Sequence, residues 1–113
     1  MFTGIIQSIG IVNNINTKDN IYSIKTSLNL DDSKNGDSIC CDGVCLTAID
    51  IKKKKLDYYF NVNVGEETIK KSNLFKWILG QKINIEKSLK VGDFLSGHFV
   101  YGHVDTTFKI KKI

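Results

Sequence analysis

The sequence predicts an all-β domain, a small antiparallel barrel or sandwich with one short helix. Apolar and polar residues alternate with period two in several short segments, and turn-forming residues recur between them. The composition, 42% hydrophobic and 25% charged over 113 residues, is typical of a single globular domain. A barrel is preferred to a sandwich because closure removes the strand edges that a small all-β domain could hardly protect otherwise.

Period-two alternation marks the candidate strands. It is clearest over residues 60–64, 83–86 and 106–110, which we expect to be half-buried strands. A further strand is expected over residues 44–51. There one face would carry Val44, Leu46 and Ala48, and the other Cys45, Thr47, Ile49 and Ile51.

Turn signals separate these segments. They are short clusters of asparagine, aspartate, glycine and lysine at residues 13–14, 18–20, 35–37, 42–43 and 91–93. The spacing is that of many short strands joined by tight turns.

One segment, residues 66–74, breaks the alternation. Glu66 and Glu67 come first and Lys70 and Lys71 follow, which is the order that a helix dipole prefers. Asn73 is a suitable terminator, so we predict a short helix here and a second helical turn over 74–79.

The three cysteines form one tight cluster. Cys40, Cys41 and Cys45 have no distant partner, so reduced thiols in a cytoplasmic protein are expected. A structural zinc site needs four ligands, usually in two separated pairs, and no metal is predicted. We expect Cys40 and Cys41 to be core residues, whereas Cys45 shares a strand face with Thr47 and could line a pocket.

Charge and the N-terminus narrow the classes of partner. All 16 basic residues are lysines, and the net charge is +4. The run 52–55 could touch phosphates, but a solvated hairpin tip is the preferred interpretation; without arginine, nucleic-acid binding is not expected. No apolar run approaches the roughly 20 residues that cross a bilayer, and no signal peptide is evident, which again indicates the cytoplasm.

Both histidines lie in one short segment, residues 97–105, and each follows a glycine. Residues five apart point to opposite faces of a strand, so His98 and His103 are poorly placed to bind one metal ion. Each could be a barrel histidine that bonds a backbone carbonyl, or a polar group of a site. A serine-histidine-aspartate triad has no support, since no nucleophile elbow is present.

Five blocks, taken together in order and spacing, resemble riboflavin synthase. The resemblance runs from Met1 to Ile113, and the blocks are residues 1–6 (MFTGII), 41–47 (CDGVCLT), 64–69 (VGEETI), 72–74 (SNL) and 97–105 (GHFVYGHVD). Ser96 and Tyr101 depart from the family pattern, which bears on the shape of the pocket.

The resemblance implies a six-stranded Greek-key barrel. Members of the family carry two such barrels in tandem and a C-terminal helix that helps to build a trimer, and this chain matches the first barrel. We expect a lumazine-binding barrel over residues 1–97, with its core reaching about residue 110. Residues 98–113 would be the last strand and the start of the linker to a second barrel, which we expect to be missing.

The resemblance also implies a reaction. Two molecules of 6,7-dimethyl-8-ribityllumazine react, and one gives a four-carbon unit to the other. The products are riboflavin and 5-amino-6-ribitylaminopyrimidinedione, and no metal or redox cofactor is needed. Such a protein has mainly to hold two rings close together, which contributes up to about 7–11 kcal/mol in the best cases.

Carried over by position, the resemblance implies four groups of substrate-binding residues. They are the N-terminal pocket edge (Gly4, Ile5, Ile6), a strand beside the ring (Cys45, Leu46, Thr47), a segment at the polar edge and ribityl chain (Asn63, Val64, Gly65, Glu66, Glu67, Thr68) and a closing segment (Gly102, His103, Val104). For catalysis, Ser38 and Cys45 match polar positions associated with addition at C7, and His103 is a candidate proton shuttle.

Two functions remain open from the sequence. The first is the N-terminal half of riboflavin synthase, in which a lone barrel would pair with itself as a homodimer with one ligand in each barrel. The second is a non-catalytic domain that holds lumazine or riboflavin.

Overall fold

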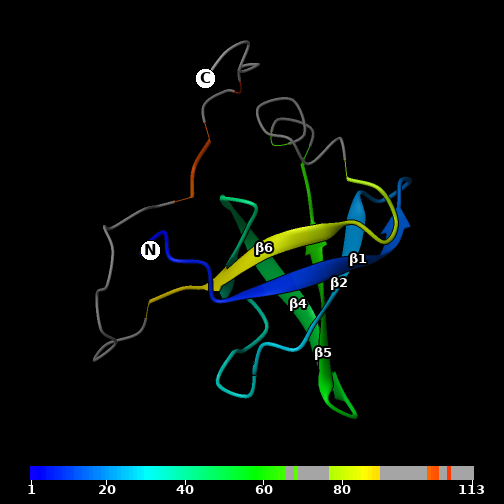
Figure 1. Ribbon diagram of the computed structural model, residues 1–113. Helices are drawn as coiled ribbons and strands as arrows, with labels where there is room; N and C mark the ends of the chain where they lie inside the picture. Colours follow the sequence, from blue (N-terminus) through cyan, green and yellow to red (C-terminus); the bar gives the residue numbers. More distant parts are fainter. Residues whose placement is uncertain (66–67, 69–76, 90–101, 105–106, 108–113) are drawn as a thin grey trace.

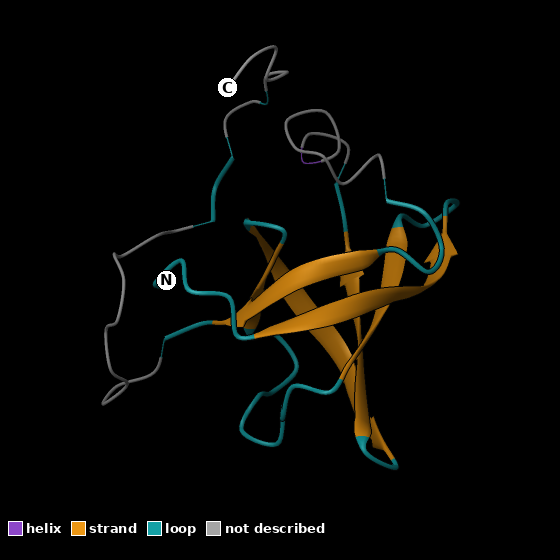
Figure 2. Ribbon diagram, in the orientation of Figure 1, coloured by secondary structure: helices purple, strands orange, loops and turns teal. Residues whose placement is uncertain are grey.

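The computed structural model describes residues 1–65, 68, 77–89, 102–104 and 107, and it shows an all-β fold (Figures 1 and 2). Six antiparallel strands close into a barrel in the order β1-β2-β5-β4-β3-β6. The strands are β1 (Ser8–Asn16), β2 (Ile21–Thr26), β3 (Ser38–Cys41), β4 (Val44–Lys54), β5 (Asp57–Asn63) and β6 (Lys82–Lys87).

The topology is a Greek key. Strands β3, β4 and β5 follow one another as neighbours, and β6 returns after a long connection to lie beside β3. Strand β6 also pairs with β1, from Ser8 opposite Ile85 to Ile11 opposite Lys82, and this pairing closes the ring. The predicted six-stranded Greek-key barrel is confirmed.

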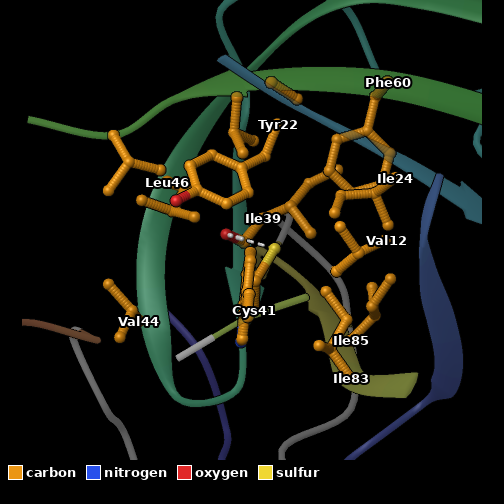
Figure 3. Close-up of a cluster of buried hydrophobic side chains, with 14 of the residues drawn as sticks. Val12, Tyr22, Ile24, Ile39, Cys41, Val44, Leu46, Phe60, Ile83 and Ile85 are labelled. Carbon is orange, nitrogen blue, oxygen red and sulfur yellow. Dashed lines mark hydrogen bonds between the residues drawn. The ribbon is translucent and has the colours of Figure 1, made fainter. Parts of the chain in front are cut away.

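The barrel interior holds one hydrophobic core, built from alternate residues of every strand (Figure 3). Fully buried side chains include Val12, Ile24, Phe60, Val62 and Ile85. Each side chain of this kind contributes about 1.5–3 kcal/mol on burial. Phe2 and Phe60 are fully buried, and Phe99 and Phe108 lie outside the described residues.

The two predicted faces of β4 are confirmed at its start and change farther along. Val44, Leu46 and Ala48 are buried in the core. A bulge follows, because Ile49 pairs with Asn61 but Lys52 pairs with Tyr59. The extra residue turns Ile51 towards the core, against which it packs, so its predicted place on the outer face is wrong.

The turn predictions hold at three described positions and fail at a fourth. Residues 18–20, 35–37 and 42–43 lie in connections between strands. At 13–14, in contrast, β1 continues and its pairing with β2 shifts register between Val12 and Asn14. Two asparagines, which favour turns, are here accommodated by a β-bulge within the strand.

The lysine run forms the tip of the β4–β5 hairpin, as the preferred interpretation had it. Strand β4 ends at Lys54 and β5 begins at Asp57, and residues 52–55 are exposed. Lys53 Nζ lies 5.6 Å from the ring centroid of Tyr58, so one lysine covers a ring of its own hairpin.

The helix predictions are only partly within the described residues. Of 66–74, only Thr68 is described, and it is helical. Of the second turn, over 74–79, residues 77–79 are described and are not helical. There the chain turns into β6 instead, since Gly80 has a φ of 85° and donates a 2.7 Å hydrogen bond to the Val12 carbonyl. Of residues 98–113, only 102–104 and 107 are described, and they lie outside the strands; the domain boundaries stay a prediction.

Candidate functional site

The β3–β4 hairpin carries two of the predicted catalytic residues, Ser38 and Cys45, on its outer face. Its turn, Asp42 and Gly43, has positive φ at both positions (50° and 84°), as a two-residue hairpin turn with the right twist requires. The register then places Cys45 opposite Cys40 and Thr47 opposite Ser38. The hairpin therefore brings Ser38 to the same part of the sheet as Cys45 and Thr47.

Alternation decides which of these side chains face outwards. Leu46 is buried in the core, whereas Cys45 on one side of it is partly exposed and Thr47 on the other is exposed. Leu46 can therefore contact a ligand on the outer face only through its backbone. Cys45 and Thr47 offer a thiol and a hydroxyl there.

The segment 102–104 lies directly against this strand, as its orange trace beside the β3–β4 hairpin shows in Figure 1. The Cys45 N–H donates a 2.7 Å hydrogen bond to the Gly102 carbonyl. Gly102 is buried and has a φ of 76°, and a Cβ at this position would lie 2.9 Å from both the N and the Cβ of Cys45. Only glycine lets the two backbones approach so closely.

The two residues after Gly102 diverge. The side chain of Val104 is partly buried and packs against the core, whereas His103 is exposed. The structure thus places His103 beside the Cys45 edge, at the outer surface.

The N-terminal segment forms another edge of the same region, along β6. The Gln7 N–H bonds the Ile85 carbonyl at 3.0 Å, and the Gly4 N–H bonds Glu86 Oε1 at 3.1 Å. Ile5 and Ile6 are 49% and 48% exposed. The predicted pocket edge therefore presents two large apolar side chains to the outside.

Asn63 ends β5 next to the start of β4, and residues 64 and 65 follow it. The last β4–β5 pair on this side joins Ala48 to Val62, so Asn63 and Thr47 are the next residues of their strands. Asn63 and Gly65 are exposed and Thr68 is partly buried. Val64 is buried in the core, held by a 2.8 Å hydrogen bond from its N–H to the Asn20 carbonyl; Glu66 and Glu67 lie outside the described residues.

The cysteines divide into two buried thiols and one accessible thiol, all three free. Burial, and then the nearby Glu86 carboxylate, raise the pKa of Cys40 to about 11. Burial also raises the pKa of Cys41 well above its usual value, and its Sγ lies 3.9 Å from the Ile39 carbonyl inside the barrel (Figure 3). Cys40 and Cys41 are buried, whereas Cys45 is partly exposed and is the thiol able to meet a ligand.

The described part of the chain lacks two features, a metal-binding cluster and a membrane-spanning helix. There, histidine, cysteine, aspartate and glutamate form no group of three or more that could hold a metal ion. Within the same residues, no helix has the length and apolar character needed to cross a membrane.

One residue of this region escaped prediction from the sequence. Glu86 is 3% exposed although it lies on β6 next to Ile85, on the face away from the core. In the sequence it ends an alternating segment and has the pattern of a solvated strand residue. Its burial depends on residues 3 and 4, more than 80 positions earlier in the chain, for which no local signal exists.

Comparisons with known proteins agree with this fold. The family model of the lumazine binding domain matches residues 3–88. Riboflavin synthase of Brucella abortus is 40% identical over 93% of this chain, and that of Bacillus subtilis is 38% identical over 100% of this chain. These alignments cover 54% and 52% of the two enzymes, so the chain spans about half the length of the curated relatives it matches.

Solved structures show the same fold at lower identity. A crystal structure of LumP complexed with riboflavin aligns with a TM-score of 0.70 and 23% identity, covering 94% of this chain and 56% of that one. A second, of LumP complexed with 6,7-dimethyl-8-(1'-D-ribityl) lumazine, aligns with a TM-score of 0.68 and 22% identity, covering 94% of this chain and 58% of that one. With the family model matching most of the chain, the Greek-key barrel that carries Cys45 and Gly102 belongs to the lumazine-binding domain family.

Proposed function

We propose that this chain is the N-terminal half of a riboflavin synthase and binds 6,7-dimethyl-8-ribityllumazine on the outer face of the β3–β4 hairpin. The observation that carries the proposal is the 2.7 Å hydrogen bond between Cys45 and Gly102. It joins two segments that the resemblance assigns independently to one ligand. A riboflavin synthase that is 40% identical to this chain in sequence supports the same activity.

The proposed reaction needs no second kind of substrate. One lumazine loses four carbons and becomes 5-amino-6-ribitylaminopyrimidinedione, and the other gains them and becomes riboflavin, so atoms and electrons balance between two identical molecules. The lumazine C7 methyl is acidic because its anion delocalises into the ring. The demand on the protein is chiefly to align two rings, for which proximity contributes up to about 7–11 kcal/mol.

Three side chains have proposed catalytic roles. Ser38 and Cys45 lie on paired strands of the hairpin and would assist addition at C7 of the acceptor. His103 follows Gly102 directly and is exposed, so it would exchange the methyl proton with solvent. The exposed Thr47 hydroxyl would bind the polar edge of the ring.

Two ligands must meet, so we propose a homodimer with one lumazine in each barrel. An isologous pair of barrels places the same face of each subunit against its partner and would bring two rings together across a twofold axis. The three free cysteines support a reducing compartment, the cytoplasm, as the place of action.

Titration with the lumazine tests both binding and turnover. Thr47→Val should weaken binding. Thr17→Val is the matched control, because Thr17 is an exposed residue of the β1–β2 turn and is not among the predicted binding residues, so this variant should bind like the unmodified chain. His103→Gln should lower the rate of riboflavin formation and flatten its pH profile. An unmodified chain that binds neither lumazine nor riboflavin would overturn the proposal.

The second candidate is a domain that holds lumazine or riboflavin without turnover. The barrel shared with LumP supports it at the level of the fold. The same titration separates the two functions, because a bound and spectrally shifted lumazine with no growth of riboflavin fluorescence would favour the binding domain.

A further inference from the structure

We propose that Glu86 is a positioning residue, whose buried carboxylate holds Thr3 and Gly4 so that Gly4, Ile5 and Ile6 form a fixed edge of the ligand site. This inference rests on the proposed function, because it assigns a role to Glu86 at the lumazine-binding face.

The Glu86 carboxylate accepts three hydrogen bonds from two neighbouring residues. Its Oε2 accepts hydrogen bonds from the Thr3 N–H (2.7 Å) and from the Thr3 hydroxyl (2.9 Å). Its Oε1 accepts one from the Gly4 N–H (3.1 Å). All three donors come from two consecutive residues, so a single carboxylate fixes both the position and the direction of the chain there.

A carboxylate is expensive to bury unless hydrogen bonds replace the water it loses, and Glu86 is only 3% exposed. A neutral apolar residue would satisfy burial at this position but would leave the Thr3 and Gly4 N–H groups without these acceptors. The contacts therefore indicate that the purpose of the carboxylate is to organise the N-terminal segment.

Register connects this anchor to the site. Glu86 pairs with Cys40 across β6 and β3, and Cys40 pairs with Cys45 across β3 and β4. The three residues form one row over neighbouring strands, with Glu86 about 10 Å from Cys45. Gly4 lies at the Glu86 end of this row and Gly102 at the Cys45 end.

Within the described part of the chain, the residues that follow Gly4 have little other support. Ile5 and Ile6 are each about half exposed, so burial in the barrel does not fix them. The Ile5 N–H bonds the Thr3 hydroxyl at 3.1 Å, the same group that donates to Glu86. The next tether is the backbone bond of Gln7 to Ile85. Between Thr3 and Gln7 the path of the chain thus depends on Glu86.

The substitution Glu86→Gln tests the role. It keeps the shape but turns one acceptor into an N–H donor that faces the donors of residues 3 and 4. We expect the Kd for 6,7-dimethyl-8-ribityllumazine to rise about tenfold, as for the loss of a hydrogen bond to a charged group. Amide hydrogen exchange should accelerate at Thr3, Gly4 and Ile5 while the amides of β3 and β4 stay protected.

A matched pair at the other partner separates positioning from folding. Thr3→Val removes the hydroxyl and should weaken lumazine binding, whereas Thr3→Ser keeps it and should restore most of the affinity. Phe60→Leu serves as the stability control, because Phe60 is fully buried in the core on β5, a strand that pairs with β2 and β4 and not with β6. It should lower the free energy of unfolding but bind lumazine normally while folded.

The outcomes are distinct. If the unmodified chain binds lumazine and both Glu86→Gln and Thr3→Val bind it equally well, the positioning role is wrong and the proposed function stands. If Glu86→Gln does not fold, the Thr3 pair decides alone. If the unmodified chain binds neither lumazine nor riboflavin, the proposed function fails, and the role of Glu86 fails with it.

Discussion

The backbone of Cys45 hydrogen-bonds the backbone of Gly102 at 2.7 Å, at a point where a single methyl group on Gly102 would collide with Cys45. The contact joins strand β4 to a segment that follows the last strand of the barrel. It is therefore the place where a small substitution should separate the two edges of the site.

Gly102→Ala should displace residues 102–104 and weaken lumazine binding by tenfold or more. The added Cβ meets Cys45 at 2.9 Å, and the φ of 76° adds backbone strain of about 1–2 kcal/mol. Gly43→Ala is the matched control, since Gly43 has a similar φ of 84° but nothing within 4 Å of the added Cβ. Fluorescence titration of both variants measures the difference, and equal affinities would contradict the site.

The thiols should react in a fixed order with iodoacetamide. Cys45 is partly exposed and should be labelled in the folded protein. Cys40, with a pKa of about 11, has about one thousandth of its thiol ionised at pH 8, and Cys41 is wholly buried. Mass spectrometry of peptides should show Cys40 and Cys41 labelled only after unfolding. Rapid labelling of Cys40 in the native state would be inconsistent with the structure.

Removing the Asp42 side chain from the β3–β4 turn should destabilise the fold. Its carboxylate accepts hydrogen bonds from the Asn84 N–H (2.7 Å) and from Trp77 Nε1 (3.1 Å), which tie the turn to β6 and to the segment before it. We expect Asp42→Ala to lower the free energy of unfolding by about 2–4 kcal/mol.

Asp50→Ala is the control for Asp42, because Asp50 has nearly the same φ (53° against 50°) and, among the described residues, its side chain accepts one long hydrogen bond, from Asn61. It should cost about 1 kcal/mol, mainly as backbone strain. Urea unfolding followed by Trp77 fluorescence compares the two variants. Equal losses would show that the Asp42 carboxylate contributes nothing beyond backbone conformation.

The raised pKa of Tyr58 predicts a loss of stability at high pH. Its hydroxyl donates a hydrogen bond to Asp31, and this bond, followed by burial, raises the pKa of Tyr58 from 10 to about 12. Between these values the folded chain keeps a proton that the unfolded chain has released, so the free energy of unfolding falls as the pH rises. The contribution is fully present below pH 10.

Urea unfolding at pH 8 and pH 11 measures this effect. The unmodified chain should lose more stability over the interval than Tyr58→Phe, which has no proton to release at this position. Tyr59→Phe, at the next position of β5, keeps the Tyr58–Asp31 bond and should behave like the unmodified chain. An identical pH dependence in Tyr58→Phe would contradict the prediction.

The barrel could be predicted because its strands carry local signals. Alternation over 44–48, 60–64 and 83–86 and the two-residue turn at 42–43 each reflect forces that act within a few residues. The bulges were not predictable in this way. Asn13 and Asn14 look like a turn in isolation, and the pairing of β1 with β2 on both sides of them keeps them in a strand.

The residues of the candidate site were predicted from motifs, whereas the residues that hold its segments in place were not. Cys45, Thr47 and Gly102 stand in blocks that resemble a known family, and the structure brings their segments together. Glu86 and Cys40 acquire their environment from strands and segments far away in the chain. Cys40 was expected in the core and is indeed buried, but beneath the outer face, in one row with Glu86 and Cys45.

Because β6 completes the ring by joining β1 to β3, both of these strands have an open side for as long as residues 82–87 are still inside the ribosome. The emerging polypeptide thus exposes two unpaired strand edges until late in its synthesis. A pause in translation while residues 82–87 are still inside the exit tunnel should accordingly increase aggregation of newly made chains, in proportion to the length of the pause.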